Sequence, residues 1–231
     1  QPASPSTADG LVVIPILLSS PEFSIGLRPE RQRILPGNSP LKGRPNRTHS
    51  AKMKALVLTS ADGPLEYSDS DDPLVLEGTA LVKLHAAALN RRDFWVTQGR
   101  YPGIQAPCIL GSDGAGVVEA VGEGGEKSWI GREVIINPGM NWGDASAAQD
   151  ESFRILGMPD NGTFAEKIAV PVEQLAAKPA EFSFHVAAAL PLAGLTAYRA
   201  LFSQGNLQEQ ETVLITGIGG GVAVMALKLA A

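Results

Sequence analysis

The chain has 231 residues, of which 44% are hydrophobic and 19% charged, a composition that supports a buried core and excludes a wholly disordered protein. The net charge of −5 argues against a protein that holds nucleic acid by basic patches, and the single cysteine excludes a disulfide framework and a cysteine-rich structural zinc site. The apolar segment 11–18 is far shorter than the roughly 20 residues that span a bilayer. We therefore expect no nucleic-acid partner and no membrane span.

Residues 1–52 differ in composition from the rest of the chain. They are rich in Pro, Ser and Arg, carry seven Lys or Arg against three acids, and show no hydrophobic period. We predict a disordered extension that the folded protein does not need. An Arg-rich, acid-poor segment also fits an organelle transit peptide, although its prolines disfavour the amphipathic helix that such a peptide needs. We expect a cytoplasmic protein, with a mitochondrial location as the alternative.

Residues 53–182 are predicted to form a compact β-rich domain, barrel-like in type. Short apolar segments between Gly, Pro and Asp clusters predict strands over 53–58, 79–87, 114–121, 132–136 and 162–170. The segment 91–98 predicts a short helix that ends at Gly99. The acidic run 68–72 is predicted to be a solvated turn.

Residues 183–231 change to an α/β pattern. Ser183 is a candidate cap for a helix that runs to Pro191, and a second helix is predicted through 197–202, ending near Gly205. An apolar strand over 211–216, a glycine turn over 217–221 and an apolar helix over 222–230 then resemble the opening of a βαβ unit. The fold class is therefore α/β overall, with the incomplete start of a Rossmann domain after the β-rich domain.

The glycine turn is the predicted cofactor site, because glycines let the backbone approach a pyrophosphate and a helix N-terminus offers it free N–H groups. The fingerprint G-x-G-x-x-G would need a third glycine where Val222 stands, but Gly217-x-x-Gly220-x-x-Ala223 places a small residue at three even intervals. A tight turn without a nucleotide is the alternative. The acid or arginine that separates NAD from NADP is expected about 20 residues onward, beyond the last residue of the chain.

Six segments in this order resemble the medium-chain dehydrogenase/reductase superfamily, in its zinc-free quinone oxidoreductase-like branch, over residues 53–231. They begin at Met53-Lys-Ala-Leu-Val, Ala88-Leu-Asn90, Gly111-Ser-Asp113-Gly-Ala-Gly116, Asn161-Gly-Thr-Phe, Leu190-Pro-Leu-Ala-Gly194 and Val213-Leu-Ile-Thr-Gly217. The resemblance implies a GroES-like domain, a Rossmann domain and a pyridine nucleotide between them, with NADPH preferred. It also implies that the chain is truncated within the Rossmann domain. Family members are commonly dimers through that domain, so a homodimer of the full-length protein is one possibility and its oligomeric state stays open.

The resemblance bears on zinc as well. Zinc-dependent relatives have Cys where Asn90 stands and His-Glu where Ser112 and Asp113 stand, and neither Asn nor Ser is a good zinc ligand. Cys108 is interpreted as a small buried hydrophobe and His85 as structural. We predict no zinc.

Candidate site residues follow from the same motifs. Asn90 is expected to face nicotinamide and substrate, Asp93 to bind Arg91 or Arg92 or to orient the site, and Tyr101 to donate to substrate or simply to pack. Thr196 is expected near nicotinamide or phosphate, with an ordinary helix residue as the alternative. The predicted cofactor-binding residues of the glycine turn are Gly217, Gly219, Gly220, Gly221, Val222 and Ala223.

These residues predict an NADPH-dependent, zinc-independent oxidoreductase that transfers hydride to a quinone or an α,β-unsaturated carbonyl, since hydrogen-bond donors can stabilise the developing enolate. The alternative is a non-catalytic, truncated GroES-like interaction module. One strand and one helix do not build the doubly wound sheet that holds a dinucleotide. We therefore expect the 231 residues alone to be inactive and to bind NADPH weakly or not at all.

Overall fold

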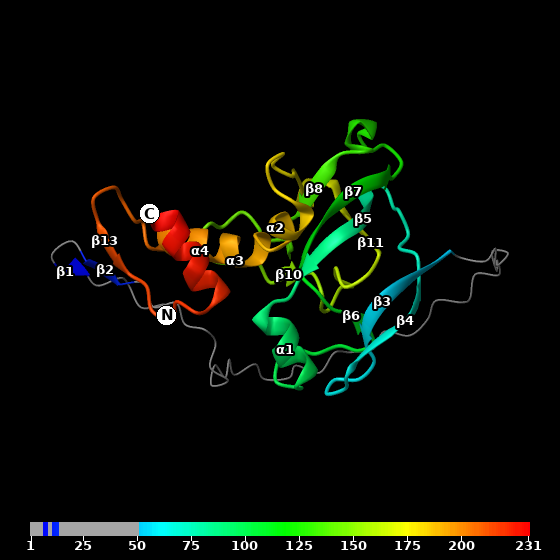
Figure 1. Ribbon diagram of the computed structural model, residues 1–231, viewed down its shortest axis with the longest axis horizontal. Helices are drawn as coiled ribbons and strands as arrows, with labels where there is room; N and C mark the ends of the chain where they lie inside the picture. Colours follow the sequence, from blue (N-terminus) through cyan, green and yellow to red (C-terminus); the bar gives the residue numbers. More distant parts are fainter. Residues whose placement is uncertain (1–6, 9–10, 14–50) are drawn as a thin grey trace, which may run out of the picture.

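The computed structural model describes residues 7–8, 11–13 and 51–231, which form a β-rich body with helices extending from one side (Figure 1). The main sheet has five antiparallel strands in the order β11–β5–β7–β8–β12. These strands are β5 (Thr79–Ala88), β7 (Asp113–Val121), β8 (Glu133–Ile136), β11 (Lys167–Pro171) and β12 (Leu175–Ala177). The predicted β-rich domain is confirmed.

A second sheet packs beside the first in the order β4–β3–β6. Its strands are β3 (Lys52–Leu58), β4 (Leu65–Asp71) and β6 (Cys108–Ile109). The segment 163–166 joins the two sheets: Leu56 N–H donates to the carbonyl of Phe164 at 2.8 Å, and Leu84 N–H donates to that of Glu166 at 2.9 Å. This connection explains the barrel-like form that the sequence predicts.

The core lies on the inner face of the main sheet. Alternate strand residues point inward, as a period of two requires, and Val82, Val118, Val134 and Ile136 are fully buried there. Strands β5 and β7 approach so closely at Gly116 that an added Cβ would overlap the carbonyl of Lys83. Strands β9 (Gly139–Met140) and β10 (Arg154–Ile155) and the 3-10 turns η1 (Lys127–Trp129) and η2 (Val172–Gln174) complete this region.

The C-terminal elements are mainly helical: α2 (Phe184–Ala188), α3 (Pro191–Tyr198), the π-helical turn η3 (Arg199–Gln204), β13 (Thr212–Leu214) and α4 (Gly221–Ala230). Ser183 caps α2 as predicted, since its Oγ accepts from Val186 N–H at 3.3 Å. Helices α3 and α4 pack through the buried side chains of Ala197, Leu201 and Ala226. The other face of α4 exposes Leu227 and other apolar side chains.

Four element predictions are wrong in detail. The acidic run 68–72 lies mostly in β4, because it pairs with β3 along its length. The strand predicted over 162–170 begins only at Lys167, since the preceding residues bond to two different strands. Pro191 starts α3 rather than merely interrupting a helix, because the first helical position needs no N–H. Strand β13 is shorter than the predicted 211–216.

Most of the predicted disordered extension, residues 1–52, lies outside the described residues. Within it, β1 (Thr7–Ala8) pairs with β2 (Leu11–Val13), β2 pairs in parallel with β13, and Lys52 opens β3. Among the described residues, no helix is long and apolar enough to cross a membrane.

Candidate active site

Asn90 lies at the junction between β5 and α1 (Arg91–Thr97), where it is the N-cap of the helix. Its backbone N–H donates to the Asp93 carboxylate at 2.8 Å, the reciprocal bond of a capping box. The helix ends at Gln98 before Gly99, whose φ of 65° a side chain would strain. This local pattern holds Asn90 and Asp93 together at the start of α1.

Asp113, at the start of β7, bonds to two separate elements through its carboxylate. Its Oδ2 accepts from Asn90 Nδ2 and its Oδ1 from the backbone N–H of Leu192 in α3, each at 2.8 Å. The side chain is buried, with only 1% of the residue exposed. Burial raises the pKa of Asp113 to about 6, although both hydrogen bonds favour the charged form.

Arg92 lies buried beneath this pair. Its Nη1 donates to Ser112 Oγ and to the carbonyl of Leu156, both at 2.7 Å, and its Nη2 donates to the carbonyl of Met158 at 3.2 Å. The Nη atoms of Arg92 thus bond to neutral oxygens, and its Nε has no hydrogen-bond partner in the structure. Of the two arginines expected to pair with Asp93, Arg92 therefore makes no hydrogen bond to it. The arginine instead ties α1 to the loop after β10.

Asp93 is the second buried carboxylate of the site. Its Oδ2 serves the helix cap, while its Oδ1 has no hydrogen-bond partner in the structure. Burial raises the pKa of Asp93, against the favourable Asn90 amide and the charge of Arg92. Asp93 orients Asn90, which is one of the two roles predicted for it.

Tyr101 and Thr196 take up different positions around this centre. The Tyr101 ring lies 5.2 Å from Arg92 Cζ and packs against the cluster that contains Leu110. Thr196 lies within α3, where its Oγ1 donates to the carbonyl of Leu192 at 2.7 Å. The structure thus places Tyr101 beside α1 and connects Thr196 to Asn90 through Leu192 and Asp113.

Three residues of this cluster are absent from the predicted site: Arg92, Ser112 and Asp113. One feature of the sequence could have indicated Asp113. It is the charged residue in the run that begins Gly111-Ser-Asp113-Gly114, whose other residues are small or apolar and favour a buried strand. A carboxylate in such a run needs partners, and these come from elements that the sequence does not show to be adjacent.

The glycine turn lies between β13 and α4. Gly217 has φ 67°, and its carbonyl accepts from Gly220 N–H at 2.9 Å. An added Cβ at Gly217 or Gly219 would meet nothing within 4 Å, so the backbone there is open. Gly220 caps α4, whose first N–H groups, at Gly221, Val222 and Ala223, are the ones that a helix leaves without intrahelical partners. An open glycine turn before a helix start is therefore present where the sequence predicts one, and such helix starts suit anions in general.

The side chains that follow the turn do not face this opening. Ala223 is 5% exposed, and Val222 packs against the cluster of Ala197, Leu201 and Ala226. Their contribution to a phosphate site is limited to backbone N–H groups.

Comparisons with known proteins agree with this geometry. Residues 76–180 match the alcohol dehydrogenase GroES-like domain. The chain belongs to the medium-chain dehydrogenase/reductase superfamily. It is 35% identical over 174 residues to the zinc-type alcohol dehydrogenase-like protein YogA of Leptosphaeria maculans, covering 71% of this chain and 49% of that protein.

Two further relatives extend the comparison. An acryloyl-coenzyme A reductase of Metallosphaera sedula is 33% identical over 184 residues, which cover 77% of this chain and 55% of that protein. A crystal structure of an NAD-dependent alcohol dehydrogenase superposes with a TM-score of 0.72 at 38% identity, over 77% of this chain and 55% of that one. The chain spans about half the length of these superfamily members.

Asn90 and Ser112, which the sequence resemblance aligns with ligands of zinc-dependent relatives, do not fit a zinc ion. The Asn90 amide donates to Asp113, and the Ser112 hydroxyl donates to the carbonyl of Leu156 at 2.7 Å, so neither presents a ligand beside the carboxylate. In the part of the chain that the structure describes, no three His, Cys, Asp or Glu side chains are grouped to hold a metal. Zinc prefers a tetrahedral set of such ligands.

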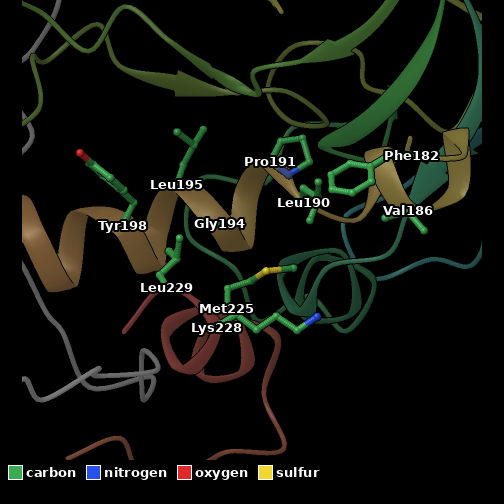
Figure 2. A pocket seen from close by; sticks show the side chains of 10 residues that line it. All are labelled: Phe182, Val186, Leu190, Pro191, Gly194, Leu195, Tyr198, Met225, Lys228 and Leu229. Carbon is green, nitrogen blue, oxygen red and sulfur yellow. The ribbon is translucent and has the colours of Figure 1, made fainter. Parts of the chain in front are cut away.

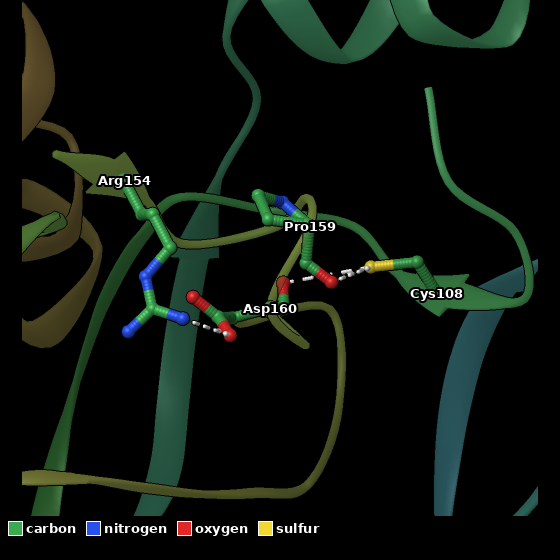
Figure 3. Close-up of polar contacts among 4 residues, drawn as sticks. All are labelled: Cys108, Arg154, Pro159 and Asp160. Carbon is green, nitrogen blue, oxygen red and sulfur yellow. Dashed lines mark hydrogen bonds and ion pairs between the residues drawn. The ribbon is translucent and has the colours of Figure 1, made fainter. Parts of the chain in front are cut away.

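Cys108 and His85 make contacts typical of residues that stabilise the fold. Figure 3 shows those of Cys108. The Cys108 thiol donates to the carbonyls of Pro159 and Asp160 at 3.6 and 3.5 Å. Burial, with a smaller contribution from Asp160, raises the pKa of Cys108 to about 11, so the thiol is neutral at pH 7. The His85 ring stacks on Phe184 at 4.5 Å between centroids.

A groove of about 560 Å³ is lined by residues of α2, α3 and α4 (Figure 2). Its walls are almost entirely apolar, with Leu195, Met225 and Leu229 among them and Lys228 as the charged member. None of the predicted site residues lines this groove. It is therefore distinct from the cluster around Asn90 and from the glycine turn.

Proposed function

We propose that the protein is an NADPH-dependent, zinc-independent oxidoreductase that transfers hydride to a quinone or an α,β-unsaturated carbonyl compound. The observation that carries this proposal is the hydrogen bond between Asn90 and Asp113 at the superfamily's zinc position. An amide held there can donate to a carbonyl oxygen, whereas it is a poor ligand for zinc. Membership of an oxidoreductase superfamily supports the general reaction.

The residues that would hold the cofactor are the glycine turn and α3. The open backbone at Gly217 and Gly219 and the first N–H groups of α4 suit a pyrophosphate, and Thr196 would contact the nicotinamide side. A bound nicotinamide supplies the hydride. A relative described as NAD-dependent supports nicotinamide use, and the preference for NADPH rests on the resemblance to quinone oxidoreductases.

The chain's own contribution is electrostatic. One amide proton of Asn90 is committed to Asp113, and the other is proposed to donate to the carbonyl oxygen that gains charge as hydride adds to the conjugated carbon. The Tyr101 hydroxyl is proposed as a second donor. Solvent then protonates the adjacent carbon. A relative described as an acryloyl-coenzyme A reductase supports a conjugated acyl substrate.

The 231 residues alone are proposed to be inactive, because the described part of the chain supplies only β13 and α4 around the glycine turn. A homodimer and a cytoplasmic location are further proposals, with mitochondria as the alternative location. The second candidate function is a non-catalytic interaction module. The exposed apolar groove between α2, α3 and α4 favours it, since large apolar surfaces often bind other proteins.

The test is NADPH oxidation by the protein expressed from its complete coding sequence, with a quinone, an enone and an enal as separate acceptors. We expect turnover with at least one conjugated acceptor and slower turnover with NADH. An Asn90→Ala variant should lose at least about tenfold in kcat/KM, as expected for the loss of a transition-state hydrogen bond. Failure with every acceptor, together with absence of NADPH binding, would favour the interaction module.

A further inference from the structure

Asp113 joins two parts of the chain that are far apart in sequence. The two donors to its carboxylate, Asn90 Nδ2 and Leu192 N–H, are 23 and 79 residues away from it. Asn90 begins α1, whereas Leu192 lies in the first turn of α3. One buried side chain therefore links the helix that carries the proposed substrate donor to the helix on the cofactor side.

The strand holds Asp113 itself firmly. Thr163 Oγ1 donates to the backbone carbonyl of Asp113 at 2.8 Å, and Ala88 pairs with it across β5 and β7. On the far side, the carbonyl of Leu192 accepts from Thr196 Oγ1 at 2.7 Å. The carboxylate is thus an acceptor held in place by the strand, to which Asn90 Nδ2 and Leu192 N–H donate.

We propose that Asp113 is a positioning residue that holds the Asn90 side-chain amide in a fixed position and orientation relative to the first turn of α3. Its two hydrogen bonds are features of the fold, whereas the benefit to catalysis rests on the proposed function of Asn90. The consequence is that Asn90 keeps one free amide proton in a defined direction, because the carboxylate can only accept and so fixes which end of the amide faces it.

The chemistry of the site requires a carboxylate at this position. An ionised carboxylate accepts a hydrogen bond at each oxygen. A side-chain amide in its place would accept only at its oxygen, and its NH₂ group would face one of the two N–H donors. The charged groups that act on Asp113 are Asp93, which raises its pKa, and Arg92, which lowers it, both from α1. With a pKa of about 6, Asp113 is mostly ionised at pH 7 and above, where both bonds can form.

The first test follows the two donors directly by NMR on the 231-residue chain. In the Asp113→Asn variant, the Asn90 side-chain amide, the Leu192 backbone amide or both should exchange protons with solvent at least about tenfold faster than in the unmodified chain. The reason is that a hydrogen bond to a charged group contributes more stability than one to a neutral group. In the double variant Asn90→Asp/Asp113→Asn, the introduced amide can accept from Leu192 and donate to the carboxylate at position 90. Protection of Leu192 should therefore return.

The matched control is Asp72→Asn, which removes a half-buried carboxylate that pairs with Lys167 on β11. It should leave both amides unchanged. Unchanged exchange of both amides in a folded Asp113→Asn variant would overturn the proposal. If that variant does not fold, the unmodified chain is titrated from about pH 8 to about pH 5, where the Asn90 side-chain signal should move with the protonation of Asp113. A signal that stays constant would also overturn it.

A kinetic readout separates positioning from the proposed function. In the protein from the complete coding sequence, Asp113→Asn should lower kcat at least about tenfold with little change in the KM for NADPH, because Asn90 acts on the transition state. Inactivity of the unmodified protein would contradict the proposed function and leave the NMR test of positioning intact. Normal kcat in a variant whose Asn90 amide is released would contradict the positioning role.

Discussion

The β-rich body and the C-terminal helices bury their apolar residues to different extents. Val134 and Ile136 on β8 are completely buried, whereas Leu227 on α4 is 51% exposed and Leu214 on β13 is 52% exposed. The strands close around one core, while α4 is covered only along its face toward α3. The difference teaches that stability of the β-rich body depends on side chains in its interior, whereas many apolar side chains of β13 and α4 add little buried surface among the described residues.

The largest expected contrast is a pair of truncations. Ile136→Ala should lower the free energy of unfolding by about 2–5 kcal/mol, because it leaves a cavity in a packed core. Leu227→Ala should change it by less than about 0.5 kcal/mol, as for other exposed positions. Chemical denaturation of the two variants measures both values, and equal losses would contradict the comparison.

The pH dependence of stability tests Asp113, which lies between the two regions. Its pKa is about 6 in the folded protein against 3.8 for an ordinary aspartate, so the folded state binds the proton more tightly. The stabilisation that results is complete below about pH 4 and is lost as the pH rises through about 6, by roughly 3 kcal/mol. We expect the stability of the natural chain relative to Asp113→Asn to fall over this window in denaturation curves. A pH-independent difference would contradict the burial argument.

Substitution of alanine for a glycine should affect stability differently in the two regions. Gly116→Ala should cost about 1–3 kcal/mol or more, because its Cβ would overlap the carbonyl of Lys83. Gly219→Ala meets open space and should change stability by less than about 0.5 kcal/mol. In the protein from the complete coding sequence, however, it should weaken NADPH binding about tenfold, since the backbone must approach the pyrophosphate. Thermal melts and calorimetry check these outcomes.

The smallest expected effect is at the boundary between the regions. Ser183→Ala removes the side-chain acceptor for Val186 N–H at the start of α2 and should cost about 1 kcal/mol. Ser183→Asp, which keeps an acceptor, is the matched control and should retain stability. A loss of equal size in both variants would show that the cap is not the cause.

The sequence predicts local features better than long-range ones. The Ser183 cap of α2 and the glycine turn before α4 each depend on residues within one turn, so pattern and composition suffice. The late start of β11 is not predictable from local pattern, since Phe164 and Glu166 in the preceding segment bond to Leu56 of β3 and Leu84 of β5, which are distant in sequence. The link from Asp113 to Leu192 likewise depends on tertiary packing. For the same reason Arg92, expected to pair with Asp93, bonds instead to Ser112 and two carbonyl groups.

We propose that Asn90 and Asp113 stand where zinc-dependent relatives of the superfamily hold their metal, and that the reaction needs no zinc. The most direct measurement is NADPH oxidation with a conjugated enone by the protein from its complete coding sequence, before and after exhaustive treatment with a zinc chelator. The account predicts equal activity in both samples, because the Asn90 amide is bonded to a carboxylate rather than available to a metal. Activity that the chelator abolishes and added zinc restores would contradict it.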